Sequence, residues 1–119
     1  MGKTILSIDC GTQSLRAAIF SMKGEVLVLK RVVYEPYKSI NPGWAEQDPE
    51  IYWDALKTAC LLLKKENSEY FNQIAGVGVT AMRDSLVNVD KQGKTLRPVM
   101  VWLDNRKAKP VFHCQCSPD

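Results

Sequence analysis

The sequence predicts an α/β fold built around a mixed β-sheet. Short apolar runs separated by turn residues fill the first third of the chain, one amphipathic helical segment follows, and an apolar run comes after it. This order of strands, helix and strand is typical of an α/β organisation. The 119 residues, of which 45% are hydrophobic and 24% charged, suit one globular domain or part of a larger one.

The first three predicted strands cover residues 4–9, 15–21 and 26–34. They are rich in β-branched and other apolar residues, which favour strands. A small polar cluster separates the first two, and the turn residues 22–25 separate the second and third. Because these connections are short, we expect an antiparallel meander.

One helix is predicted after the irregular, proline-containing connection 35–48. Asp48 is placed as the N-cap and Pro49 as the first helical residue, and the helix is expected to end near Asn67. Apolar side chains at helical spacing predict its buried face: Trp53, Leu56, Ala59, Cys60 and Leu63.

Residues 74–81 form a nearly continuous apolar run, which predicts a parallel, central strand buried on both faces. Another strand is expected at 85–90, a turn at 91–94, and a short extended segment at 99–102. No internal repeat or low-complexity tract interrupts this organisation.

Composition excludes several classes of protein. The 16 basic and 13 acidic residues give a net charge of +3, too small to predict a nucleic-acid partner, and no aromatic platform is interleaved with the basic residues. No apolar run approaches the ~20 residues of a membrane-spanning helix, and no secretory signal is expected. We therefore expect a cytoplasmic chain with four free thiols: Cys10, Cys60, Cys114 and Cys116.

A metal site is also conceivable at His113, Cys114 and Cys116, which lie close together in the sequence. A tetrahedral zinc site needs a fourth ligand and usually wider cysteine spacing. No fourth ligand is nearby in the sequence, so zinc is not the favoured interpretation.

The turn after the first strand is the first candidate site. Gly11 would let an anion approach the backbone, and the hydroxyls of Thr12 and Ser14 could donate to phosphate oxygens. Asp9 could bind Mg²⁺ directly or through water, and Arg16 adds a positive charge. The turn is neither a Walker A loop nor a dinucleotide fingerprint, because it leads into a strand. A merely polar hairpin is an equally good interpretation of this segment alone.

Two further candidate sites follow apolar segments. Arg83 and Asp84 come after the run 74–81 and offer a donor and an acceptor suited to neighbouring hydroxyls of a polyol, although a surface ion pair would look the same. Trp102 and Asp104 could supply an apolar wall and a hydroxyl acceptor for a sugar. A core tryptophan followed by a helix N-cap is the alternative there.

Taken together, four motifs in order resemble the FGGY carbohydrate kinases, the family of glycerol, xylulose and related sugar kinases. The motifs are Ile-Asp-Cys-Gly-Thr-Gln-Ser-Leu-Arg at 8–16, Pro-Gly-Trp-Ala-Glu-Gln-Asp-Pro at 42–49, Gly-Val-Gly-Val-Thr-Ala-Met-Arg-Asp at 76–84, and Val-Trp-Leu-Asp-Asn-Arg at 101–106. The resemblance covers about residues 4–108, and the second motif is much more particular than the first.

The resemblance implies a ribonuclease H-like (actin-like ATPase) domain, one of two lobes that close around MgATP and a sugar or polyol. It implies that Asp9 assists Mg²⁺ and that the phosphates lie among Gly11, Thr12, Gln13, Ser14 and Arg16. The residues expected to contact the substrate are Arg83, Asp84, Trp102 and Asp104. Asp84 stands where glycerol kinases have glutamate, so its reach is shorter by one methylene.

The chain is much shorter than members of this family. Residues 1–108 are expected to form an incomplete N-terminal domain, followed by an irregular tail at 109–119. The catalytic base, the second phosphate motif and the adenosine-binding lobe would lie elsewhere, so we expect little or no kinase turnover from this chain alone. A non-catalytic ATPase-fold binding module is the alternative. Exposed lobe-facing surface also predicts self-association.

Overall fold

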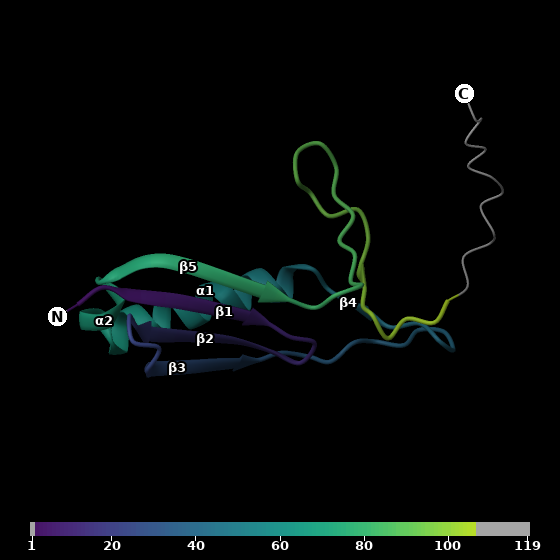
Figure 1. The fold of residues 1–119 in the computed structure, drawn as a ribbon. Coiled ribbons are helices and arrows are strands. Elements are labelled where there is room, and N and C mark those ends of the chain that lie inside the picture. Colours follow the sequence, from purple (N-terminus) through teal and green to yellow (C-terminus); the bar gives the residue numbers. More distant parts are fainter. Residues whose placement is uncertain (1, 107–119) are drawn as a thin grey trace, which may run out of the picture.

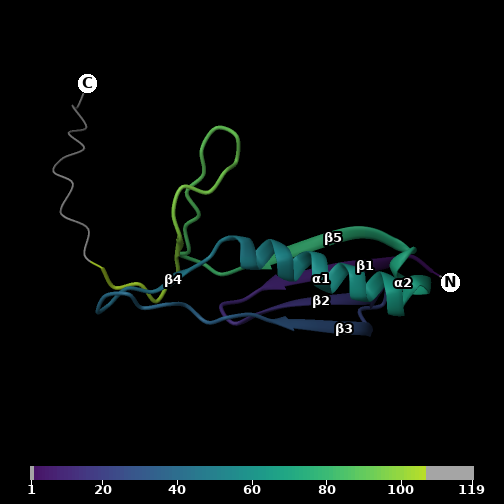
Figure 2. The same ribbon diagram turned by 180° about the vertical axis from the view of Figure 1, so that it is seen from behind.

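The computed structural model describes residues 2–106, which form a four-stranded mixed sheet with one helical layer against it (Figures 1 and 2). The order of strands across the sheet is β3-β2-β1-β5. Their bounds are Thr4–Cys10 for β1, Ser14–Ser21 for β2, Val26–Val33 for β3 and Ile74–Ala81 for β5. The predicted α/β class and the antiparallel meander are confirmed.

The register of the meander places three charged residues in one row across the sheet. Asp9 of β1 lies opposite Arg16 of β2, and Arg16 in turn lies opposite Arg31 of β3. Ile8 and Cys10, the neighbours of Asp9, belong to the core beneath the helix. Because side chains alternate between the two faces of a strand, the charged row lies on the face turned away from that helix.

Helix α1, Glu50–Glu66, covers the other face of the sheet, across β2 and β3 (Figure 2). The helix begins close to the predicted position. Pro49 has helical backbone angles, and the Asp48 carboxylate accepts the N–H of Glu50 at 3.0 Å. The predicted buried face needs correction. The Trp53 side chain is 58% exposed, and Ala55 packs inward in its place.

The core between this helix and the sheet contains small helical residues against branched strand residues. Its fully or nearly buried members are Leu6, Ile8, Leu15, Ala17, Ile19, Ala55, Ala59 and Leu63. A second short helix, α2 (Ser68–Phe71), was not predicted; it follows α1 directly and leads into β5. The alanines let α1 approach the sheet closely, which fixes the distance between the two layers.

Strand β5 pairs parallel to β1, as predicted, but lies at the edge of the sheet. The prediction that this strand is central and buried on both faces is therefore wrong for the described residues. Val77 and Val79 are 60% and 72% exposed. The helical layer covers β2 and β3 rather than β5, so Ile74 packs against the core but Val77 and Val79 find no covering partner among residues 2–106.

A second, two-stranded sheet lies beyond the ends of β1 and β5. It joins β4 (Glu46–Gln47), which was not predicted, to β6 (Val99–Met100). The strand expected at 85–90 is absent from the described structure, where only two isolated bridges join this segment to residues further along. Residues between β5 and β6 instead form a projecting loop (Figure 1).

Residues 107–119 lie outside the described structure, and with them the proposed tail and the cluster of His113, Cys114 and Cys116. Within residues 2–106 no helix is both long and apolar enough to cross a bilayer. Cys10 and Cys60, which the structure describes, are free thiols.

Candidate functional site

The turn between β1 and β2 is closed by its own backbone. The N–H of Gly11 donates to the carbonyl oxygen of Ser14 at 3.0 Å. A Cβ atom added to Gly11 would lie 3.1 Å from that same oxygen, tighter than ordinary contact. A side chain at position 11 would therefore press on the bond that closes the turn, in addition to hindering any close approach of a ligand.

The three carbonyl groups of this turn are all held by the protein. The Tyr34 hydroxyl donates to the Gly11 oxygen, Gln47 Nε2 donates to the Thr12 oxygen at 2.8 Å, and the Tyr34 N–H donates to the Gln13 oxygen at 3.1 Å. The N–H groups of Thr12 and Gln13 have no acceptor within residues 2–106. Successive free N–H groups of this kind make an anion-binding concavity.

Gln47 ties the turn to helix α1 and to the segment after β3. It is only 3% exposed, and its Nε2 also donates to the Glu35 carbonyl at 3.2 Å. Its Oε1 accepts the Tyr52 hydroxyl of α1 at 2.5 Å. Burial raises the pKa of Tyr52 to about 12, so the hydroxyl remains a donor near neutral pH. The sequence favours the segment around Gln47 as a packed loop anchor, but the motif 42–49 does not reveal the contacts of Gln47 with Thr12 and Tyr52.

Charged side chains flank the turn on the open face of the sheet. Arg16 Nη1 lies 2.7 Å from Asp9 Oδ2, and both side chains are accessible to solvent. Arg31 Nε donates to the Ser14 hydroxyl at 3.1 Å, which leaves the hydroxyl proton of Ser14 free to donate. Arg31 was not predicted, because its place beside the turn depends on the pairing of β2 with β3.

A hollow of about 290 Å³ opens in front of this turn. Four of its lining residues belong to the turn, and the rest come from β2, β3 and the later segments: Gly11, Thr12, Gln13, Ser14, Arg16, Arg31, Tyr37, Trp102 and Leu103. All five residues predicted to surround phosphates are therefore brought together around one cavity.

A second hollow, also of about 290 Å³, lies beside the first and is lined by Met82, Arg83, Asp84 and Trp102. Met82 and its neighbours follow directly from β5, whose last residue pairs with the last residue of β1. Asp84 has a positive φ of 57°. Within the described structure, neither the Arg83 guanidinium nor the Asp84 carboxylate forms an ion pair, so both remain available to a ligand.

Trp102 forms a wall between the two hollows. Its indole Nε1 donates to the Thr12 hydroxyl at 3.0 Å, and that hydroxyl lies 3.3 Å from the Met82 sulfur. Thr12 therefore contacts residues of both hollows. A ligand in either hollow would touch the same tryptophan.

Asp104 lines neither of the two hollows. Its carboxylate accepts the N–H of Ala45 at 2.8 Å and binds Arg106 at 2.7 Å through Nε. Hydrogen bonding from Arg106 lowers the pKa of Asp104. Arg106 also reaches Glu46 at 2.7 Å and stacks over Trp44 at 3.9 Å, so this network fastens the segment 42–49 to the segment after β6.

The residues present fit a magnesium ion that is held mainly by a nucleotide. Within residues 2–106 no three His, Cys, Asp or Glu side chains gather as a metal cluster. Asp9 offers one carboxylate oxygen without a protein partner at the edge of the turn. Mg²⁺ keeps several waters and is commonly bound through one or two carboxylates and substrate phosphates, which matches this donor set.

Cys10, next to Asp9, is not a candidate nucleophile. Burial raises the pKa of its thiol, so the thiolate form is scarce near neutral pH.

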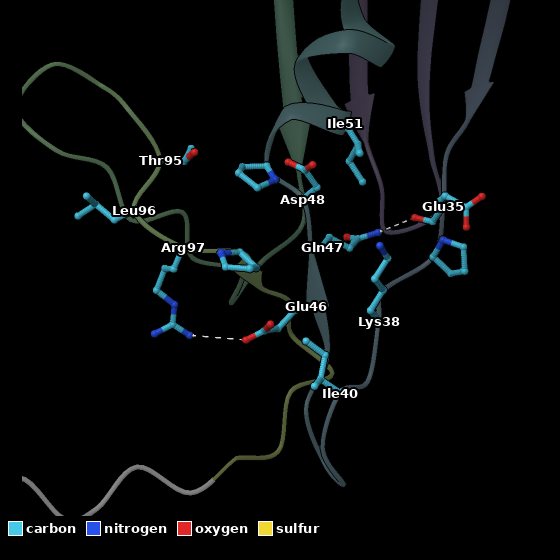
Figure 3. A pocket seen from close by; sticks show the side chains of 13 residues that line it. Glu35, Lys38, Ile40, Glu46, Gln47, Asp48, Ile51, Thr95, Leu96 and Arg97 are labelled. Carbon is cyan, nitrogen blue, oxygen red and sulfur yellow. Dashed lines mark hydrogen bonds and ion pairs between the residues drawn. The ribbon is translucent and has the colours of Figure 1, made fainter.

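A larger cavity of about 520 Å³ lies apart from these hollows, between residues 35–51 and the segment 95–98 (Figure 3). Glu46 and Arg97 face each other across it, with Arg97 Nη2 4.0 Å from Glu46 Oε1. It contains none of the residues that the sequence predicted for a site.

Comparison with known proteins places these features in one family. Residues 4–116 match the FGGY family of carbohydrate kinases, N-terminal domain. The chain is 38% identical over 115 residues to the glycerol kinase of Thermococcus gammatolerans, an alignment that spans 93% of this chain and 22% of that protein. The chain thus spans about a fifth of the length of the curated relatives it matches.

Two solved structures are similar over most of the described fold. A xylulose kinase from Brucella ovis superimposes with a TM-score of 0.83 at 26% identity, covering 87% of this chain and 22% of that one. Plasmodium falciparum glycerol kinase with ADP gives a TM-score of 0.71 at 28% identity, covering 88% and 21%. The predicted ribonuclease H-like fold is confirmed, and this chain belongs to the FGGY family of carbohydrate kinases, of which it carries the N-terminal domain.

Proposed function

We propose that this chain supplies the first half of the active site of an ATP-dependent carbohydrate or polyol kinase. The observation that carries the proposal is the pair of hollows joined at Trp102. One contains free backbone N–H groups and two arginines, suited to phosphates, and the other contains an uncommitted arginine and aspartate, suited to hydroxyls. A phosphate donor and a hydroxyl acceptor would then meet at Thr12.

The residues of this chain would bind and orient both reactants. Thr12 and Gln13 would donate backbone N–H groups to phosphate oxygens, and Arg16, although paired with Asp9, would donate from its guanidinium group. Arg83 would donate to one hydroxyl of the sugar and Asp84 would accept from its neighbour, while Trp102 would pack against the carbon skeleton. Holding the reactants in this way supplies the positioning on which phosphoryl transfer depends.

Asp9 would hold the magnesium ion of the nucleotide, either directly or through water. When bound, the ion would neutralise charge on the phosphates during transfer. The free oxygen of Asp9 and the solvent access to its carboxylate support this role.

The chain alone should bind its ligands and turn them over slowly or not at all. It spans 22% of the glycerol kinase it resembles, and phosphoryl transfer needs groups on both sides of the γ-phosphate. The free thiols of Cys10 and Cys60 fit a reducing compartment such as the cytoplasm. A binding module without chemistry is the second candidate, and the failure of polyols to bind would favour it.

The test is nuclear magnetic resonance of the 119-residue chain titrated with MgADP, glycerol and xylulose. We expect MgADP to shift the amide signals of Thr12 and Gln13, and a polyol to shift those of Arg83 and Asp84. Asp84→Asn should weaken the polyol response and spare that of MgADP. A response to MgADP alone would favour the binding module, and no response to any ligand would contradict the proposal. A coupled assay for ADP release checks the expected low turnover.

A further inference from the structure

We infer that Arg31 is a second phosphate-binding cation, and that it supplies the positive charge that Arg16 cannot. The inference rests on the proposed function of the β1–β2 turn as a phosphate site. Arg31 lies on β3, and this strand contains none of the four motifs and none of the predicted site residues.

Arg31 is placed on the hollow by strand pairing. It lies opposite Arg16 in the β2–β3 register, on the sheet face turned away from α1. Both arginines line the cavity in front of the turn. The hydrogen bond from Arg31 Nε to Ser14 fixes the direction of the side chain and leaves its two terminal nitrogens free for a ligand.

The balance of charge around the hollow depends on Arg31. Arg16 is paired with Asp9 at 2.7 Å, so together they contribute no net charge. No carboxylate of residues 2–106 lies within 4.0 Å of the Arg31 guanidinium. The row of Asp9, Arg16 and Arg31 therefore carries one unit of net positive charge, and the unpaired cation is Arg31.

The pairing of two arginines is unfavourable for the fold by itself. Like charges directly opposite each other on antiparallel strands destabilise a sheet. The Ser14 hydroxyl, which accepts the hydrogen bond from Arg31, is neutral and does not cancel the charge. An anion between the two guanidinium groups would cancel it, and Arg suits phosphate because its fork of N–H donors matches two phosphate oxygens.

The experiment measures binding of MgADP and of inorganic tripolyphosphate to the 119-residue chain by calorimetry, at low and at physiological salt. The variants are Arg31→Gln and Arg31→Lys. The matched control is Lys30→Gln, which removes the same charge from the adjacent residue on the other face of β3, where Lys30 pairs with Glu66. Circular dichroism verifies that each variant is folded.

We expect Arg31→Gln to weaken binding of both ligands by roughly tenfold and to reduce the dependence on salt. Arg31→Lys should recover part of this loss, and Lys30→Gln should match the wild type. In the absence of ligand, Arg31→Gln should not lower the thermal midpoint, because it removes a like-charge neighbour of Arg16.

Equal affinities of the wild type and Arg31→Gln would overturn the inference about Arg31 and leave the phosphate site intact. Equal losses in Arg31→Gln and Lys30→Gln would overturn it as well, since they would indicate only a general effect of net charge. Failure of the wild type to bind either ligand would contradict both the inference and the proposed function.

Discussion

Replacing Gln47 by leucine tests whether the Gln47 side chain holds the β1–β2 turn in shape. Leucine is similar in size but can neither donate to the Thr12 carbonyl nor accept the Tyr52 hydroxyl. The site is only 3% exposed, so water cannot readily substitute for the lost side-chain amide.

The expected loss follows from the groups left without partners. An unsatisfied buried polar group costs about 1–3 kcal/mol, and here the Thr12 oxygen and the Tyr52 hydroxyl are affected. The 3.2 Å bond to Glu35 counts for less, because Glu35 is exposed and its carbonyl can bind water. Burying the apolar leucine side chain recovers part of this loss. We therefore expect Gln47→Leu to lower the free energy of unfolding by about 2–4 kcal/mol.

Urea unfolding monitored by circular dichroism measures this change. With a slope of about 2 kcal/mol/M, the midpoint should fall by on the order of 1 to 2 M. Gln73→Leu is the matched control, because Gln73 is half-buried but its side chain forms no hydrogen bond in the described structure; its effect should stay within ~0.5 kcal/mol.

A double-mutant cycle with Tyr52→Phe isolates the contact between the two side chains. The two substitutions should be non-additive by at least ~0.5 kcal/mol. If Gln47→Leu costs less than ~1 kcal/mol, or if its effect simply adds to that of Tyr52→Phe, the idea that Gln47 anchors the turn is wrong.

Three further changes test other parts of the structure. Gly11→Ala should weaken MgADP binding severalfold in calorimetry, because its Cβ would press on the Ser14 oxygen at 3.1 Å; unchanged affinity would show that the turn can relax. Asp104 has a pKa below its ordinary value of 3.8, so its stabilising effect is present at neutral pH and lost on acidification below about pH 4. Urea midpoints of Asp104→Asn should therefore fall less than those of the wild type between about pH 7 and pH 3, and parallel curves would refute this. Val79→Lys should reduce self-association in size-exclusion chromatography at high concentration, because it places a charge on the exposed edge strand β5; a wild type that is already monomeric would contradict the expectation.

Features set by neighbouring residues were predicted well. The meander follows from short connections, and the start of α1 follows from Asp48 and Pro49, whose chemistry acts within one turn of helix. The residues predicted for the site come from the first, third and fourth motifs, and the structure brings them around two adjoining hollows, apart from Asp9 and Asp104.

Features set by distant partners were missed. The role of Gln47 depends on contacts with Thr12 and Tyr52, and that of Arg31 on the register of β2 with β3; neither leaves a local pattern. The apolar run of β5 predicts burial, but burial requires a covering layer, which residues 2–106 do not provide for that strand. Asp104 was assigned to the substrate because a carboxylate beside tryptophan looks the same whether it binds a sugar or Arg106.

The hydrogen bond between Thr12 and Trp102 joins residues 90 positions apart in the sequence. Contacts between distant residues form late in folding, because a long loop must close before they are gained, whereas the β1–β2–β3 meander needs only short loops. The β1–β2 turn can therefore form before Trp102 has reached its place between the two hollows. Refolding of a variant in which phenylalanine replaces Trp44 and Trp53 should accordingly show the fluorescence change of Trp102 developing after the strands have formed.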